Sequence, residues 1–215
     1  MDTASLPPKP DLWTGEPRPP RAPLDWEGVK PGRRQKAGIS KVMQPPPGEG
    51  RILEWFYPDR MGRLMAGITL TLIGVVFCVI REAGFGWIVY WWIWLILSPW
   101  PFVFLLTGRT GRMSAGADWL GIGKGIFIKT YDLTAVKVFV DGAAHVIDMT
   151  DKHGGSVRVK TFALQQNQEL WDLVYNGILH SVHVGGAQTN KRARDYLLLD
   201  FPPHLRNRQG GQGCR

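Results

Sequence analysis

The chain has 215 residues, a formal net charge of +8 at pH 7, and an unusual combination of 26 Gly, 16 Pro and 10 Trp. It has two cysteines, Cys78 inside an apolar run and Cys214 beside the last residue, which argues against a disulfide-linked scaffold. The excess of basic residues favours anionic partners, namely lipid headgroups, nucleic acid or an acidic protein.

The N-terminal segment, residues 1–50, contains eleven prolines and few large apolar side chains. Such a segment buries too little surface to offset the entropy lost on ordering it. We therefore expect a disordered, Pro-rich basic tail over residues 1–50. Residues 17–23 have the proline spacing of a polyproline II ligand, which leaves two roles open: a solvated linker, or a segment that docks on a partner.

Three consecutive aromatic residues, Trp55, Phe56 and Tyr57, precede the first apolar run. Aromatic rings of this kind suit the headgroup region of a bilayer, where one edge of the ring is wet and the other is dry. We expect residues 51–63 to form an interfacial segment with one or two helical turns.

Two charge-free runs follow, at residues 64–80 and residues 86–106, and arginines flank the first. Each run is long enough to cross the hydrocarbon core of a membrane as a helix. The short connection between the runs predicts a two-helix transmembrane hairpin over residues 64–107, in the plasma membrane. Pro99 and Pro101 should kink the second helix, because proline removes a backbone donor.

Basic residues near the two runs are distributed asymmetrically. On the side of the chain termini lie five arginines: Arg51, Arg60, Arg63, Arg109 and Arg112. The connection between the runs carries one, Arg81, beside Glu82. Because basic flanking residues stay in the cytoplasm, this pattern predicts a multi-pass protein with both termini cytoplasmic.

The two runs have complementary side-chain sizes. One stripe of small residues lies on the first run: Gly67, Thr71 and Gly74. A stripe of large residues lies on the second: Trp87, Trp91 and Trp94. Small residues let helix backbones approach and leave room for rings, so we expect Gly74 near Trp91 and Thr71 near Trp94. Packing between copies in a homo-oligomer, and binding of a quinone or lipid, stay open as alternatives.

After Met113 the pattern changes to the period of two that is typical of strands. Five strands are predicted, at residues 118–122, 125–129, 136–140, 144–149 and 156–162. A helix with one apolar face follows at residues 165–179. We therefore expect a membrane α+β protein, with a small antiparallel β domain over residues 117–180 that a helix closes. Residues 181–215 are predicted to be a polar tail, with one short helix capped by Thr189 or Asn190.

Residues 125–178 carry a recurring order of short motifs. A strand, then Asp132-Leu133-Thr134, then a strand, then Thr150-Asp151-x-x-Gly154, a strand and a helix follow one another after the apolar hairpin. This order resembles the bacterial pleckstrin-homology-like (PH-like) membrane proteins. The resemblance implies a curved antiparallel sheet closed by a helix. The five predicted strands are fewer than the seven usual in that family.

Few residues form patterns that are typical of a catalytic or metal site. The glycine-rich stretch 121–125 lacks the spacing of a phosphate-binding loop and reads as a hairpin turn. His180 and His183 could offer two imidazoles to a metal, but no further ligand stands at suitable spacing. Three carboxylates near the sheet have no evident proton partner: Asp141, Asp148 and Asp151. We expect no enzyme activity, no cofactor and no metal.

One candidate binding surface is basic. Arg158 and Lys160 alternate with valines on a predicted strand, and with Lys137 and Lys152 they could contact inner-leaflet anionic lipid. The expected function is a non-enzymatic, membrane-anchored interaction or scaffold protein that binds lipid and an unidentified membrane or cytoplasmic protein. The alternative is an accessory membrane subunit of a DNA-transfer or secretion machine, whose basic tails contact DNA or a motor protein.

Overall fold

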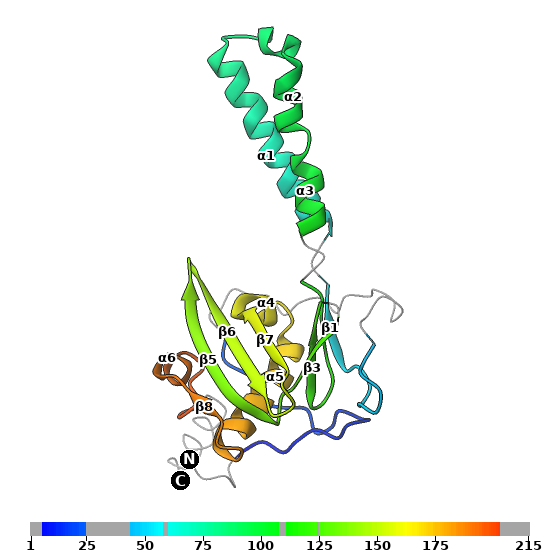
Figure 1. The fold of residues 1–215 in the computed structure, drawn as a ribbon, viewed down its shortest axis with the longest axis vertical. Helices are drawn as coiled ribbons and strands as arrows, with labels where there is room; N and C mark the ends of the chain where they lie inside the picture. Colours follow the sequence, from blue (N-terminus) through cyan, green and yellow to red (C-terminus); the bar gives the residue numbers. More distant parts are fainter. Residues whose placement is uncertain (1–5, 25–43, 58–59, 108–110, 124, 203–215) are drawn as a thin grey trace, which may run out of the picture. The chain divides into compact units, whose positions relative to one another are not determined.

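The computed structural model describes residues 6–24, 44–57, 60–107, 111–123 and 125–202, and its ribbon is drawn in Figure 1. The chain divides into two compact units. The β unit comprises Met1–Phe56 and Arg112–Arg215, and the helical unit comprises Tyr57–Gly111. The helical unit is thus an insertion within the sequence of the β unit.

The first sheet of the β unit has four antiparallel strands in sequence order. They are β1 (Glu54–Phe56), β2 (Met113–Ala115), β3 (Trp119–Ile122) and β4 (Ile126–Lys129). Strand β1 pairs with β2 across the insertion, with Trp55 opposite Ser114. The expectation of a helical interfacial segment is therefore wrong at residues 54–56. Leu53 and Glu54 are buried in the β unit, and β1 receives its hydrogen bonds from β2.

The second sheet has the order β7-β6-β5-β8. Its strands are β5 (Leu133–Asp141), β6 (Ala144–Asp151), β7 (Ser156–Lys160) and β8 (Gln188–Thr189). Strands β5, β6 and β7 are antiparallel, and β8 runs parallel to β5. The five predicted strands are confirmed as β3 to β7. The two mainly antiparallel sheets and their helices make an α+β fold.

Two helices follow β7, namely α4 (Thr161–Gln165) and α5 (Gln168–His183). The predicted apolar face of α5 is buried, with Leu170, Leu173 and Ile178 almost fully enclosed. Gly177 allows close approach to the sheet region, because a Cβ atom there would lie 2.6 Å from Cβ of Thr130. The closing helix predicted over residues 165–179 is thus confirmed, displaced by a few residues.

The Pro-rich N-terminal residues 6–24, which we call the strap, pack on the β unit. Ala22 is buried, and Trp171 on α5 donates a hydrogen bond from its indole N–H to the carbonyl of Pro23 (2.8 Å). The carbonyl of Gly50 likewise accepts from the indole of Trp119 (3.1 Å). The prediction of disorder is therefore wrong for residues 6–24 and 44–50. Residues 1–5 and 25–43 lie outside the described residues.

The predicted polar tail is also partly wrong. Helix α6 (Lys191–Tyr196) begins at Asn190, whose side chain accepts from the backbone N–H of Ala193 (2.8 Å). Leu197 and Leu199, which follow α6, are fully buried in the core of the β unit. Asn190 is thus confirmed as the helix cap, and the end of the tail, residues 203–215, lies outside the described residues.

The helical unit contains one long helix and three short ones. These are α1 (Arg60–Arg81), the 3-10 helix η3 (Gly86–Val89), α2 (Trp91–Leu97) and α3 (Trp100–Thr107). In the described part of the chain, α1 alone is long and apolar enough to cross a membrane as a single helix. The second predicted span is not one continuous helix. Its predicted interruption at proline is confirmed, because α2 ends before Pro99 and α3 starts after it.

Candidate functional site

The small-residue stripe of α1 contacts the second half of the helical unit. A Cβ atom on Gly67 would lie 2.6 Å from Cα of Pro101, and one on Gly74 would lie 2.5 Å from a methyl group of Leu97. The hydroxyl of Thr71 lies 3.0 Å from the carbonyl of Gly67 and 3.2 Å from that of Leu97. These contacts bring the helix backbones close together, as the stripe predicts.

The partners of the stripe differ from those predicted. Leu97 occupies the place expected for Trp91 beside Gly74, while Trp91 and Trp94 are 71% and 43% exposed. Of the three tryptophans, only Trp87 is buried, at 2% exposure, and its ring lies 5.4 Å from that of Trp94. The physical reason is the broken backbone. Residues 86–107 form three short helices, which shift the register expected from one straight helix.

An open pocket of about 450 Å³ lies in the helical unit, where α1 ends. Gly74, Cys78, Trp87, Tyr90 and Trp92 contribute to its lining. The buried indole N–H of Trp87 has no hydrogen-bond partner among the described residues. A buried donor without a partner costs free energy, and the pocket lining also includes the charged residues Arg81 and Glu82.

The predicted basic residues do not all lie together. Arg158 and Lys160 are exposed on β7, as expected from their alternation with buried valines. The strand register places Asp148 between Lys137 and Arg158 on the same sheet face, so an acidic residue interrupts the basic row. We call Lys137, Arg158 and Lys160 the basic face. Lys152 lies in the β6–β7 loop instead, where its ammonium is 3.6 Å from the carboxylate of Asp132.

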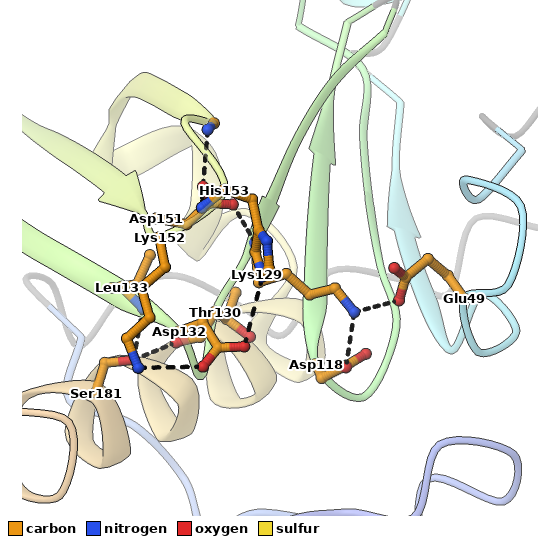
Figure 2. Close-up of polar contacts among 11 residues, drawn as sticks. Glu49, Asp118, Lys129, Thr130, Asp132, Leu133, Asp151, Lys152, His153 and Ser181 are labelled. Carbon is orange, nitrogen blue, oxygen red and sulfur yellow. Dashed lines mark hydrogen bonds and ion pairs between the residues drawn. The ribbon is translucent and has the colours of Figure 1, made fainter.

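Figure 2 shows the polar cluster that joins the two sheets of the β unit. The buried carboxylate of Asp151 accepts hydrogen bonds from the backbone N–H groups of Lys129 (3.0 Å), His153 (2.9 Å) and Gly155 (2.7 Å). Three such bonds satisfy most of the acceptor capacity of one carboxylate. Asp151 therefore fixes the β6–β7 loop against β4 and leaves little capacity for a ligand.

The side chain of Lys129 forms the other half of this cluster. Its ammonium lies 2.8 Å from Glu49 and 3.5 Å from Asp118. Burial acts to lower the pKa of Lys129, but the hydrogen bond to Glu49 and the charges of Asp118 and Glu49 outweigh it and raise the pKa. Lys129 is thus a paired cation that attaches residue 49 to the sheet, and its role is structural.

The candidate metal and phosphate sites are not supported by the geometry. The ring of His180 contacts the carbonyl of Pro7 (2.6 Å), and that of His183 contacts the carbonyl of Leu199 (2.8 Å). In the described residues there is no group of three or more His, Cys, Asp or Glu side chains that could hold a metal ion. Gly123 and Gly125 have positive φ angles of 64° and 80°, as in a turn.

The contact between α5 and the strap was not predicted. Four polar residues follow one another every fourth position along α5: Gln168, Asp172, Asn176 and His180. Each contacts the backbone of the strap, at Ala22, Pro8 or Pro7. The signal in the sequence was this polar stripe beside the apolar face of the helix, because buried polar side chains need hydrogen-bond partners.

A pair of carboxylates lies where the strap, β1 and α5 meet. Glu54 is only 5% exposed, and burial raises its pKa to about 7, with the neighbouring Glu169 acting in the same direction. The guanidinium of Arg18, 3.1 Å from Glu54, partly opposes this rise. The junction therefore holds a carboxyl group that binds a proton near neutral pH.

Comparison of the chain with protein-family models, with curated proteins and with solved structures found no match.

Proposed function

We propose that the protein is a membrane-anchored interaction protein, without enzyme activity, whose helical unit crosses the plasma membrane twice and whose β unit lies in the cytoplasm. In this proposal the β unit is a PH-like scaffold domain that binds anionic lipid or a protein partner at the membrane surface. The pairing of β1 with β2 on either side of the helical unit carries the proposal.

Strands β1 and β2 are neighbours in one sheet, so residues 56 and 113 must lie on the same side of any membrane. The chain between them must then cross an even number of times. Helix α1 has the length and composition of one crossing. If α1 crosses, the apolar segment that contains α2 and α3 crosses back, and its broken helices are tolerated because α1 packs against them.

The positions of the two chain ends support the same topology. The strap packs on α5 and residues 187–199 pack in the same core, so both described ends of the chain belong to the β unit. They therefore lie on one side together. The arginines that flank the helical unit on this side, against the single Arg81 in the connection, favour the cytoplasm.

The strand count supports the PH-like interpretation of the β unit. Strands β1 to β4 form one antiparallel sheet, and β5 to β7 form the antiparallel part of the other. This makes seven antiparallel strands followed by the helix α5. Seven is the number usual in the PH-like family, whereas only five strands were predicted from the sequence. Fold alone does not establish function. In the described residues there is no group of three or more His, Cys, Asp or Glu side chains that could hold a metal ion.

The proposed partners follow from the basic face and its tether. Lys137, Arg158 and Lys160 are exposed, and only a few residues of chain connect β1 and β2 to the membrane segment. A tether raises the local concentration of the surface at the bilayer, so weak attraction suffices for binding. The alternative of a DNA-transfer or secretion subunit rests on the basic composition of the tails alone.

The topology is tested by cysteine labelling in intact cells. In a Cys78→Ala, Cys214→Ser background, Gly84→Cys places a thiol in the connection between the helices, where a Cβ atom meets nothing within 4 Å. Ser156→Cys places one on the exposed surface of β7. A membrane-impermeant maleimide should label position 84 from outside and position 156 only after lysis. Labelling of both, or of neither, before lysis would overturn the two-crossing topology.

A further inference from the structure

We infer that the surface of the β unit formed by α5 and residues 50–54 is a docking site for the strap of a second copy of this chain, so that two copies exchange their straps. The strap is drawn in blue in Figure 1. The inference names a second copy as a partner within the proposed function. It rests on the proposed membrane anchoring only for the high local concentration of copies.

Side chains of α5 hold the strap near both of its ends. Near one end, the carboxylate of Asp172 accepts from the backbone N–H of Ala22 (2.8 Å). Near the other end, the amide of Asn176 donates to the carbonyl of Pro8 (3.3 Å). These bonds form between the side chains of the helix and the backbone of the strap. A strap that comes from another copy presents the same groups at the same spacing.

The strap is attached to the β unit without strand pairing. In the described residues, the hydrogen bonds between its backbone groups and other backbone groups stay inside the strap, as from Gly15 to Asp11 (2.9 Å). Its bonds to the rest of the β unit involve at least one side chain, as between Arg18 and Glu54 (3.1 Å). Because neither sheet contains the strap, it can leave without breaking a strand ladder.

The surface under the strap is part of the apolar core. Trp171 on α5 is fully buried, and Ala22 of the strap belongs to the same core. Leu6 and Leu24 of the strap pack against this core. Departure of the strap would expose apolar surface, at a cost that grows with the area uncovered. A departing strap must therefore be replaced by a segment that makes the same contacts, and the strap of a second copy makes all of them.

The chain between the strap and β1 is long enough for this exchange. Residues 25–43 join the strap to the rest of the β unit, and nineteen residues can span up to about 60 Å. A folded unit of the size of the β unit is about 40 Å across. A strap can thus stay attached to one copy while it lies on α5 of another. Anchoring in one membrane keeps the copies close, which raises the local concentration of the second strap.

Cross-linking between two differently tagged versions of the full chain tests the exchange. Both versions carry Cys78→Ala and Cys214→Ser, so that they have no native thiol. One carries Pro8→Cys in the strap, and the other carries His180→Cys on α5, beside the carbonyl of Pro7 in the structure. The two versions are produced in the same cells and treated there with bismaleimidoethane, a short membrane-permeant reagent that joins two thiols. A covalent product that carries both tags is the expected result.

Three control variants separate docking from chance encounters. Ser156→Cys, at an exposed position on β7, replaces Pro8→Cys and measures random contact between copies. Ala22→Pro, added to the version with Pro8→Cys, removes the N–H that Asp172 accepts and should lower the amount of double-tagged product roughly five- to tenfold. Trp13→Phe, at a strap residue that is 65% exposed, should leave the amount unchanged.

The results that would overturn the exchange are specific. Double-tagged product at the level of the Ser156→Cys control, or equal effects of Ala22→Pro and Trp13→Phe, would each do so. A single chain that carries both Pro8→Cys and His180→Cys should become linked within itself and between copies. Links only within that chain would show that each copy keeps its own strap. No link of either kind would show that the strap does not lie on α5, and the inference would fall as well.

The membrane topology is read separately by the labelling at positions 84 and 156. If that labelling gives the expected pattern and no double-tagged product forms, the exchange alone is wrong. If the product forms and the labelling fails, the exchange stands and the two-crossing topology is wrong.

Discussion

The carboxylate of Asp172 accepts a hydrogen bond from the backbone N–H of Ala22, at 2.8 Å and across 150 positions of sequence. The side chain of Gln168 donates to the same carboxylate (2.6 Å) and lies 3.4 Å from the carbonyl of Ala22. Pro19, Pro20 and Pro23 have no backbone N–H, so within residues 19–23 only Arg21 and Ala22 can donate one. The contact therefore fixes the position of the strap on α5.

Loss of one strap contact should loosen the strap measurably. Trp171→Phe removes the donor to the carbonyl of Pro23 and should lower the free energy of unfolding by about 1 kcal/mol. Limited proteolysis should also cut the strap sooner than in the parent protein. The control is Trp13→Phe, at an exposed tryptophan of the strap itself. It should change neither the free energy of unfolding nor the rate at which the strap is cut. Equal behaviour of the two variants would contradict the role of Trp171.

Close packing in the helical unit should rank three glycine substitutions. Gly67→Ala meets the backbone of Pro101, which cannot move aside, and should cost about 1–3 kcal/mol. Gly74→Ala meets the flexible end of Leu97 and should cost less, with the loss relieved by Leu97→Ala. Gly84→Ala meets open space and should be neutral. Thermal unfolding in detergent measures the order of the three stabilities. A Gly67→Ala protein that is as stable as the parent would refute this order.

The stability contributed by Glu54 and Asp172 should fall as the pH rises from about 4 to 7. Burial raises the pKa of Glu54 to about 7 and that of Asp172 to about 6, both above the ordinary values for these groups. At these two carboxyl groups the folded protein binds more protons than the unfolded chain in this window, so their contribution to the free energy of unfolding decreases with pH. Burial lowers the pKa of His180, which contributes in the opposite direction. Glu54→Gln should flatten the upper part of the curve, and the exposed Asp141→Asn should not. If the stability of the parent protein relative to Glu54→Gln rises across this window, the sign is wrong.

Removal of the Asp151 carboxylate should separate the two sheets at one edge. Asp151→Ala leaves three backbone N–H groups without their acceptor and should cost about 3 kcal/mol. Asp151→Asn keeps one acceptor oxygen and should cost less. The comparison is Asp132→Ala, which removes partly exposed ion pairs with Lys152 and His153 and should cost below about 1 kcal/mol. Similar losses for Asp151→Ala and Asp132→Ala would argue against the buried cluster.

Neutralising the basic face should weaken attraction to anionic bilayers. Arg158→Gln with Lys160→Gln removes two charges from exposed positions on β7 and should leave the fold unchanged. Flotation of the protein in nanodiscs with anionic vesicles should drop, and flotation with neutral vesicles should not change, because each basic residue near such a surface contributes about 1 kcal/mol. Lys191→Gln with Arg192→Gln on α6 removes equal charge elsewhere. If both double variants float alike, the attraction reflects net charge and not this face.

The elements with strong local patterns were predicted well, and those held by distant contacts were not. Alternating valines predicted β5 and β7, and the spacing of leucines predicted α5. Strand β1 was missed because its pairing partner stands beyond the helical unit, and a three-residue strand has no period of its own. The strap was missed because its composition is that of a disordered segment, and order comes from the polar stripe on α5.

The candidate sites divide in the same way, into features set by a local pattern and features set by distant contacts. Alternation within one strand was enough to predict that Arg158 and Lys160 are exposed. The position of Asp148 between Lys137 and Arg158 follows only from the strand register. The small stripe of Gly67 and Gly74 was readable on one helix, but its partner Leu97 depends on how the backbone breaks before Pro99. A position on one element can be read from sequence, and a contact between two elements depends on tertiary geometry.

The pairing of β1 with β2 also dictates an order of events during synthesis. Strand β1 leaves the ribosome before the apolar segment, and Asn167, whose side chain donates to the carbonyl of Trp55 (3.0 Å), emerges more than a hundred residues later. The strap and β1 therefore cannot form their contacts with α5 until translation has passed α5. If the helical unit inserts in a membrane as proposed, its insertion precedes closure of the β unit, and a chain released early would leave an anchored but unfinished domain.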